Sequence, residues 1–379
     1  MNLFKLFFSL DHLRSIKVPN HYHLIDCFRT IAALAVVLHH YQHFYYFDGF
    51  INIENYLTIE NVSLQPFYAS LYYLYEAGAA GVQFFWVISG FIFASVYFMR
   101  DVSGKDFFVS RFARLYPLHF ITLLLILCLQ IFSNHAYGTY QIYEFNDLKH
   151  FILNLFFASS WGIENGPSFN GPIWSVSVEI LIYIIFFASQ KFLFRFGLLI
   201  PLSFCILFLG LSYFNIMQII GLSGNIAACG FFFFSGSCIF HLNQVLKNYY
   251  KGALIFVFSF IGGSILTLFV INYLPLSYLI YVIPFIIFFI INIDNFDIKV
   301  FKKISNIGNL SYGIYLWHVP LQIFIILFLY KLNHADRLDV LSSNLFFMSY
   351  IALLILISHL GFKYIENPLR KSLNKRLKK

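Results

Sequence analysis

The stretch FRTIAALAVVLHHYQHF, residues 28–44, is apolar along most of its length, but it carries an arginine near one end and three histidines near the other. An apolar run of this length is typical of a helix that crosses a lipid bilayer. Ionisable side chains are costly inside a bilayer, so they normally face the interior of a helical bundle and mark a pathway or a site. The stretch therefore predicts a membrane-spanning helix that brings polar groups to a functional site.

The composition of the whole chain is that of a polytopic membrane protein. The 379 residues are 60% hydrophobic and 11% charged, with a mean hydropathy of +0.74, far from the values of soluble globular domains. Apolar segments of spanning length recur about ten times, which predicts an all-α bundle of about ten transmembrane helices. The expected spans lie near residues 24–46, 68–98, 115–133, 173–194, 198–218, 225–242, 252–272, 276–293, 310–331 and 345–365.

The basic residues indicate how this bundle is oriented. Of the 25 Lys and Arg residues, 21 fall in segments on one side of the membrane. Lys149, Lys331 and Arg337 fall on the other side, and Arg29 lies at the inner edge of the first span. Because cytoplasmic loops carry an excess of Lys and Arg, we expect both termini in the cytoplasm. Topology thus explains the net charge of +8, and no feature supports nucleic-acid binding.

The segments outside the spans complete this organisation. Residues 1–23 are expected to be a cytoplasmic lead-in and not a signal peptide, because no small-residue cleavage site follows their short apolar stretch. Residues 24–371 form the membrane domain, and residues 372–379 form a basic cytoplasmic tail. Residues 134–172 are placed on the outer side, with a short interfacial or re-entrant helix near 150–161 followed by a loop rich in Gly, Pro and Asn.

The polar groups of the first span follow one face of a helix. Arg29 and His40 are eleven residues apart, which returns to within about 20° of the same face and rises roughly 16 Å. His43 follows at i+3 and continues this face, whereas His39 points elsewhere. Hydrogen bonds to neighbouring helices would also explain the histidines, but the aligned arginine favours a site. Arg29 is then at the cytoplasmic end and His40 lies deep in the membrane.

A second candidate group is an arginine pair. Arg111 and Arg114 in VSRFARLYP share one helical face at the cytoplasmic boundary. They are either ordinary flanking charges or a fork for phosphate oxygens, which guanidinium groups bind in bidentate fashion. A phosphate-rich cosubstrate that arrives from the cytoplasm would meet this pair first.

Two further spans carry polar side chains at helical spacing. In the first of them these residues are Ser175, Glu179 and Tyr183. In the second they are Ser311, Tyr315 and His318. Packing does not readily explain a glutamate inside a spanning helix, and His318 carries more weight than the tyrosines, which are common at membrane interfaces. The cysteines have no metal-ligand spacing, so no metal site is expected.

Six stretches, taken together and in this order, resemble the acyltransferase 3 family of integral membrane acyltransferases. The resemblance covers about residues 24–371. The stretches are IDCFRTIAALAVVLHH (25–40), GVQFFWVISGF (81–91), FVSRFARLYP (108–117), WSVSVEILIY (174–183), SYGIYLWHVPL (311–321) and FKYIENPLRK (362–371).

This resemblance implies transfer of an acyl group, commonly acetyl from cytoplasmic acetyl-CoA, to a hydroxyl of a glycan or other acceptor on the outer side. The arginine and histidine of the family's first helix fall on Arg29 and His40, its arginine pair falls on Arg111 and Arg114, and its Trp-Ser and acidic residues fall on Trp174, Ser175 and Glu179. We assign roles accordingly. Catalysis is assigned to His40 and Glu179; acyl-CoA binding to Arg29, Arg111 and Arg114; and substrate binding to Trp174, Ser175, Tyr315 and His318.

Some questions stay open on the sequence. His40 acts either as a base on the acceptor hydroxyl or as the carrier of the acyl group. The acceptor is a surface glycan such as O-antigen, capsule or exopolysaccharide, or peptidoglycan, a glycolipid or a small molecule. The expected location is a bacterial inner (plasma) membrane. Some relatives carry an esterase-like domain that has no counterpart here, so the protein is expected to act alone or with a separate partner. The rival hypothesis is a secondary transporter with an intramembrane relay.

Overall fold

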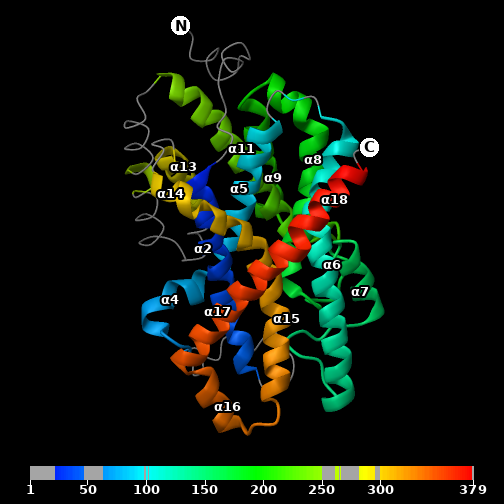
Figure 1. The fold of residues 1–379 in the computed structure, drawn as a ribbon. Helices are drawn as coiled ribbons and strands as arrows, with labels where there is room; N and C mark the ends of the chain where they lie inside the picture. The colour runs from blue at the N-terminus through cyan, green and yellow to red at the C-terminus, as the bar shows by residue number, and fades with distance from the viewer. Residues whose placement is uncertain are drawn as a thin grey trace. The chain divides into compact units, whose positions relative to one another are not determined.

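The computed structural model describes residues 22–46, 63–97, 100, 102–249, 261–263, 265, 281–294 and 299–377. Every regular element in these ranges is a helix (Figure 1), which confirms the all-α prediction. The chain divides into two compact units, which are described one at a time. The first comprises residues 1–29, 82–104 and 178–308, and the second comprises residues 30–81, 105–177 and 309–379.

Seven helical segments in the described part of the chain are long and apolar enough to cross a membrane, and each overlaps an expected span. They are His23–Tyr45, Ala80–Tyr97, Gly104–Tyr137, Gly171–Leu193, Gly224–Gln244, Val300–Leu329 and Asn344–Leu377. Shorter apolar helices, Leu199–Tyr213 and Ile283–Ile293, occupy two more expected spans. The expected span 252–272 and the lead-in 1–23 lie almost wholly outside the described residues. The count of ten and the orientation of the termini therefore stay predictions.

The first unit is built around aromatic residues. It contains most of α5 (Ala80–Tyr97) and α8 (Trp174–Arg195), together with α9 (Leu199–Tyr213), α10 (Ile216–Ile219), α11 (Gly224–Tyr249), α13 (Ile283–Asp294), α14 (Lys299–Ile304) and the start of η5 (Ser305–Leu310). The ring of Phe93 stacks on Tyr183 with centroids 4.4 Å apart, and it meets Phe186 and Phe233 edge to face at 5.4 Å. These rings join α5, α8 and α11 in one core.

The second unit holds the histidine-rich segment. It contains most of α2 (His23–His39), η1 (His40–Tyr45), α4 (Tyr68–Ala77), α6 (Gly104–Tyr137), α7 (Leu148–Leu155), η3 (Gly171–Ile173), α15 (Ser311–Leu329), α16 (His334–Leu341), α17 (Asn344–Gly361), the π-helix η6 (Phe362–Glu366) and α18 (Asn367–Leu377). The helices α15 and α17, which cross in the view of Figure 1, are in contact. The Tyr41 hydroxyl donates to the Leu341 carbonyl at 2.8 Å, which ties η1 to α16.

The helix boundaries differ from the expected ones in two places. The expected span 68–98 is divided into α4 and α5 at Gly78, where a Cβ atom would lie 2.1 Å from the carbonyl oxygen of Ala35. The chain therefore turns where glycine lets it touch the backbone of α2. In addition, α6 begins at Gly104, so Arg111 and Arg114 lie inside a helix that also continues through Pro117.

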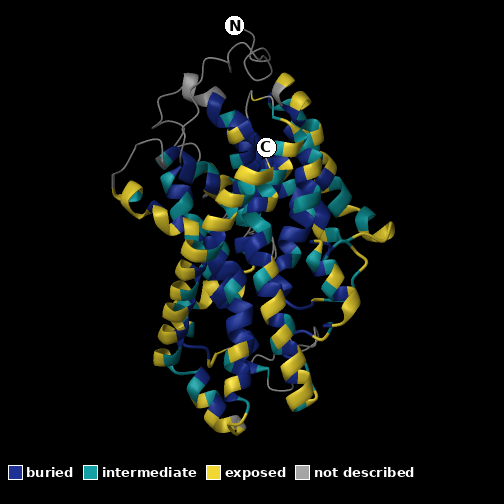
Figure 2. Cartoon of the chain, turned by 45° about the vertical axis from the view of Figure 1, so that its right-hand side comes forward, coloured by how far each residue is buried: buried dark blue, intermediate teal, exposed yellow. Residues whose placement is uncertain are grey.

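The segment near residues 150–161 contains a short helix, as predicted. α7 has eight residues, Leu148–Leu155, far fewer than the roughly 20 that a span needs. Its carboxyl end rests on α6, where the buried His119 bonds through Nε2 to the Asn154 carbonyl at 2.8 Å. Figure 2 shows that the long helices carry a buried face and an exposed face. The side of the membrane on which α7 lies stays a prediction.

The crossing of α5 and α11 depends on two glycines. A Cβ atom at Gly90 would lie 1.7 Å from the Phe233 carbonyl oxygen, and one at Gly236 would lie 1.9 Å from the Val87 carbonyl oxygen. The two backbones are thus in direct contact, as small residues allow between membrane helices. Gly90 and Gly236 therefore serve helix packing at this crossing.

Gly90→Ala should therefore destabilise the protein, because the clash is with backbone and no side chain can move aside. Overpacking of this kind costs about 1–3 kcal/mol. Thermal unfolding of the detergent-solubilised protein, followed by intrinsic fluorescence, measures the effect. Gly210→Ala is the matched control, since a Cβ atom there meets nothing within 4 Å. Equal melting temperatures for the two variants would contradict the prediction.

Candidate active site

The histidines of the first span come together because the helix changes its winding. α2 ends at His39, and the 3-10 helix η1 begins at His40. A 3-10 helix has three residues per turn, so side chains at i and i+3 lie over each other. The rings of His40 and His43 accordingly stack, with centroids 4.8 Å apart and planes 17° from parallel. The predicted alignment of these two histidines is confirmed.

A histidine from α15 completes this cluster. His318 Nε2 lies 2.9 Å from His40 Nδ1, and the two rings are 9° from parallel. One proton must lie between these nitrogens, because two lone pairs do not bond. His318 is fully buried, whereas His40 is partly exposed. His40 Nε2 makes no hydrogen bond to a residue that the structure describes, so it is the nitrogen left for a substrate.

The bond between the two rings can be made in two directions. When His40 Nδ1–H donates to His318 Nε2, the lone pair of His40 lies on Nε2. In the opposite tautomer the proton of His40 lies on Nε2. Only the first tautomer leaves His40 Nε2 able to accept a proton.

Gln322 fixes the orientation of the third ring. Its Nε2 donates to the His40 carbonyl oxygen at 2.9 Å, and its Oε1 lies 3.0 Å from His43 Nδ1. If the amide were reversed, Gln322 Oε1 would face the His40 carbonyl oxygen, and two hydrogen-bond acceptors would meet. Oε1 must therefore face His43. His43 therefore carries its proton on Nδ1. Gln322 is fully buried, and it was not among the predicted site residues.

The neighbouring histidine is engaged elsewhere, as its position on the helix predicts. His39 Nδ1 donates to the Tyr75 carbonyl oxygen at 2.9 Å. Its ring is tilted by 51° relative to that of His40, at a centroid distance of 5.5 Å. His39 thus links α2 to α4 and is not stacked in the cluster.

Two of the predicted substrate residues bond to each other. The Tyr315 hydroxyl donates to the Pro172 carbonyl oxygen at 2.6 Å, and the Ser175 hydroxyl lies 2.7 Å from the Tyr315 oxygen. These bonds join the start of α8 to α15, one turn before His318. Trp174, at the first position of α8, is partly exposed. A role of these residues in substrate binding stays a prediction.

The residues predicted to bind acyl-CoA and the predicted catalytic glutamate are distributed over both units. Arg111 and Arg114 lie one turn apart on α6 in the second unit, partly exposed. In the first unit, Arg29 forms an ion pair with Asp26 at 3.3 Å, and Glu179 is buried. Arg29 therefore already has a carboxylate partner one turn away. The roles assigned to these four residues stay predictions.

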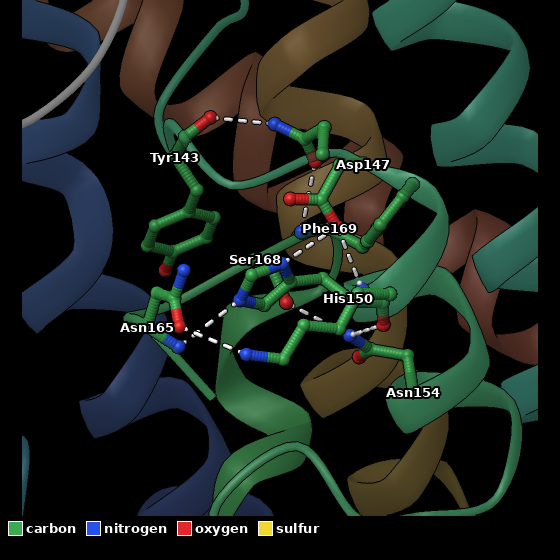
Figure 3. Close-up of polar contacts among 9 residues, drawn as sticks. Tyr143, Asp147, His150, Asn154, Asn165, Ser168 and Phe169 are labelled. Carbon is green, nitrogen blue, oxygen red and sulfur yellow. Dashed lines mark hydrogen bonds and ion pairs between the residues drawn. The ribbon is translucent and has the colours of Figure 1, made fainter. Parts of the chain in front are cut away.

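A compact loop follows α6 and is held by its own hydrogen bonds (Figure 3). The Asp147 carboxylate accepts from the backbone N–H of His150 at 2.9 Å and from its ring Nδ1 at 2.8 Å. On the other side of the ring, His150 Nε2 accepts from the backbone N–H of Asn165 at 3.1 Å. His150 is thus bonded as a neutral imidazole. These three residues, together named the loop clasp, tie α7 to the segment that leads into η3.

A comparison with protein families identifies the family of this chain. A family model described as an acyltransferase domain matches residues 22–362. The chain belongs to the acyltransferase 3 family. The matched range contains all the predicted site residues and the histidine cluster. Among the described residues, no group of three or more His, Cys, Asp or Glu side chains is placed to hold a metal ion.

A curated protein gives a more specific comparison. The chain is similar to the peptidoglycan O-acetyltransferase OatA of Listeria monocytogenes serovar 1/2a, at 23% identity over 338 residues. The match covers 78% of this chain and 52% of the relative, so the chain spans about half the length of that protein. No solved structure matches the chain significantly.

The loop clasp generates a prediction about the stability of α7. Asp147 is the N-cap of α7, and loss of such a cap costs about 0.5–2 kcal/mol. Asp147→Ala should speed amide hydrogen exchange across α7, whereas Asp147→Asn keeps an acceptor for both bonds and should not. The backbone N–H of His150 holds the pKa of Asp147 below its usual value. The clasp is therefore fully formed above about pH 4 and weakens as the pH falls further. Fast exchange in both variants would contradict this role.

Proposed function

We propose that this protein is a membrane O-acyltransferase that moves an acyl group, in the form of acetyl, from acyl-CoA to a hydroxyl of a glycan. The observation that carries the proposal is the bond between His40 Nδ1 and His318 Nε2. A base must be oriented by a second group if it is to act on a hydroxyl. His318 orients His40 in this way and leaves Nε2 for the substrate.

The reaction follows from this geometry. His40 Nε2 takes the proton of the acceptor hydroxyl as the oxygen attacks the carbonyl carbon of the thioester. The tetrahedral intermediate then expels the thiolate of coenzyme A, which takes the proton from His40. An ester and free coenzyme A result, and the histidine returns to its neutral form. The alternative, in which Nε2 itself carries the acyl group, requires the same free nitrogen. Quenched single-turnover mixtures separate the two, since only the second gives labelled protein.

The donor and acceptor are assigned from chemistry and from the relative. Arg111 and Arg114, with Arg29, are proposed to bind the phosphates of cytoplasmic acyl-CoA. The name of the Listeria relative supports a cell-envelope glycan as the acceptor, with peptidoglycan, O-antigen, capsule and exopolysaccharide as candidates. A bacterial inner membrane is the proposed location. The family assignment favours this enzymatic function over a transporter.

His40→Ala should abolish acyl transfer while the protein remains inserted, because it removes the proposed base. The measurement is release of ester-linked acetate by mild base from envelope glycans of cells that express each variant. His39→Asn is the matched control: its amide N–H replaces the Nδ1–H that donates to the Tyr75 carbonyl, so transfer should persist. Transfer by His40→Ala at the wild-type level would refute the assignment.

Arg114→Gln should raise the KM for acetyl-CoA by roughly 10- to 100-fold, because a hydrogen bond to a charged group contributes about 1.5–3 kcal/mol. The same variant should use acetyl-pantetheine, which lacks the phosphates, as well as the wild type does. Arg195→Gln is the control, since Arg195 lies at the end of α8 over the Phe196 ring. A loss of activity that is equal for both donors would show that Arg114 has another role.

A further inference from the structure

Several fully buried polar atoms have no hydrogen-bond partner in the described structure, and two of them belong to residues on either end of a chain of contacts through Tyr143. These two atoms are Nε2 of His43 and Oδ1 of Asn170, and both side chains are 0% exposed. An unpaired buried polar atom is costly, and each one in a native protein needs an explanation. A ligand that supplies hydrogen-bond donors to both atoms is such an explanation.

The neighbours of these atoms show that both are acceptors. His43 carries its proton on Nδ1, because it faces the Gln322 oxygen, so its Nε2 offers a lone pair. Asn170 Nδ2 donates to the Leu316 carbonyl oxygen at 3.0 Å, which excludes a reversed amide and leaves Oδ1 as the free end. A ligand that matches these two atoms must therefore present hydrogen-bond donors, as hydroxyl groups do.

The ring of Tyr143 contacts His43 and the residue that follows Asn170. It meets the His43 ring edge to face, with centroids 5.7 Å apart. It also lies against Gly171, where a Cβ atom would be 2.3 Å from Tyr143 Cζ and 2.5 Å from the hydroxyl oxygen. Gly171 directly follows Asn170 in the chain. Tyr143 thus links the histidine cluster to the segment that carries Asn170.

The backbone is strained immediately before both loop residues. Ile142, which precedes Tyr143, has φ 68°, and Phe169, which precedes Asn170, has φ 47°. The left-handed region is unfavourable for residues with bulky side chains, and above all for a β-branched one. Such strain persists where the surrounding structure imposes it, and it clusters at functional sites. Here both strained residues are buried, and the Phe169 N–H is held by Asn146 Oδ1 at 3.0 Å.

We propose that His43 Nε2 and Asn170 Oδ1, which Tyr143 links through its contacts with His43 and Gly171, form a subsite that binds hydroxyl groups of the sugar acceptor. The inference rests on the proposed function and specifies its acceptor as a polyol. A sugar presents several hydroxyls on adjacent carbons, whereas the thioester end of acyl-CoA presents none. The His43 ring is stacked on that of His40, so a hydroxyl held by His43 lies next to the hydroxyl that His40 activates.

The test measures the KM for the glycan acceptor and the KM for acetyl-CoA separately. Purified protein is assayed with labelled acetyl-CoA and with de-O-acetylated envelope glycan from cells that lack the protein, its concentration given as hexose equivalents. This mixture contains every candidate acceptor. His43→Asn keeps an amide N–H for Gln322 but has no atom at the Nε2 position, and it should raise the acceptor KM at least about tenfold. The KM for acetyl-CoA should stay within about twofold of that of the wild type.

Two more variants sharpen the result. His43→Gln places an acceptor oxygen near the former Nε2 position, so it should recover part of the affinity that His43→Asn loses. Asn170→Leu removes the second acceptor at similar volume and should also raise the acceptor KM, which keeps the test valid if His43→Asn does not fold. His39→Asn, outside the subsite, should leave the acceptor KM unchanged.

The remaining outcomes overturn the proposal in distinct ways. If the KM for the glycan is unchanged in both His43→Asn and Asn170→Leu, the two atoms do not bind the glycan. A raised KM for acetyl-CoA would assign them to the amide groups of the pantetheine chain. A fall in kcat without a change in either KM would indicate a structural role. If the wild type itself transfers no acetyl group to any envelope glycan, the proposed function fails first.

Discussion

The amide of Gln322 is the constraint on which the arrangement of the site depends. It donates to the backbone of His40 and accepts from the ring of His43, so one side chain sets both the position of one histidine and the tautomer of another. In a bundle that excludes water, such groups must satisfy one another. As a result, Nδ1 of His43 is fixed as a hydrogen-bond donor, and Nε2 of His43 is left without a hydrogen-bond partner among the described residues.

The sequence predicted this cluster in part, because helical periodicity extends over a few turns. The spacing from His40 to His43 correctly indicated a shared face, although the rings align through a 3-10 turn and not through a continued α-helix. The stripe of Ser311, Tyr315 and His318 extends one turn further to Gln322, so a signal for this residue was present. Neither the bond between His40 and His318 nor that between Ser175 and Tyr315 follows from spacing, since each joins helices far apart in the chain.

Other features were beyond the reach of a single sequence. Tyr143 and Asn170 lie in irregular segments with no periodicity, and their importance appears only when the backbone brings them against the cluster. The break between α4 and α5 likewise depends on Gly78 meeting the carbonyl of Ala35, a contact that hydropathy does not reveal. Glycine contacts of this kind recur at Gly90 and Gly236. Close backbone approach thus positions helices for which lipid provides no hydrophobic driving force.

The stacking of His40 on His43 also limits how many protons the cluster can hold. Two imidazolium rings at the observed 4.8 Å would repel each other by about 3.5 kcal/mol at an effective dielectric constant near 20. The second protonation is thereby disfavoured more than a hundredfold, so the cluster acts as a reservoir for a single proton. In the proposed reaction, the proton taken from one hydroxyl must leave with the thiolate before another hydroxyl is activated. The stack therefore imposes strict alternation of proton uptake and release, with one ester formed in each cycle.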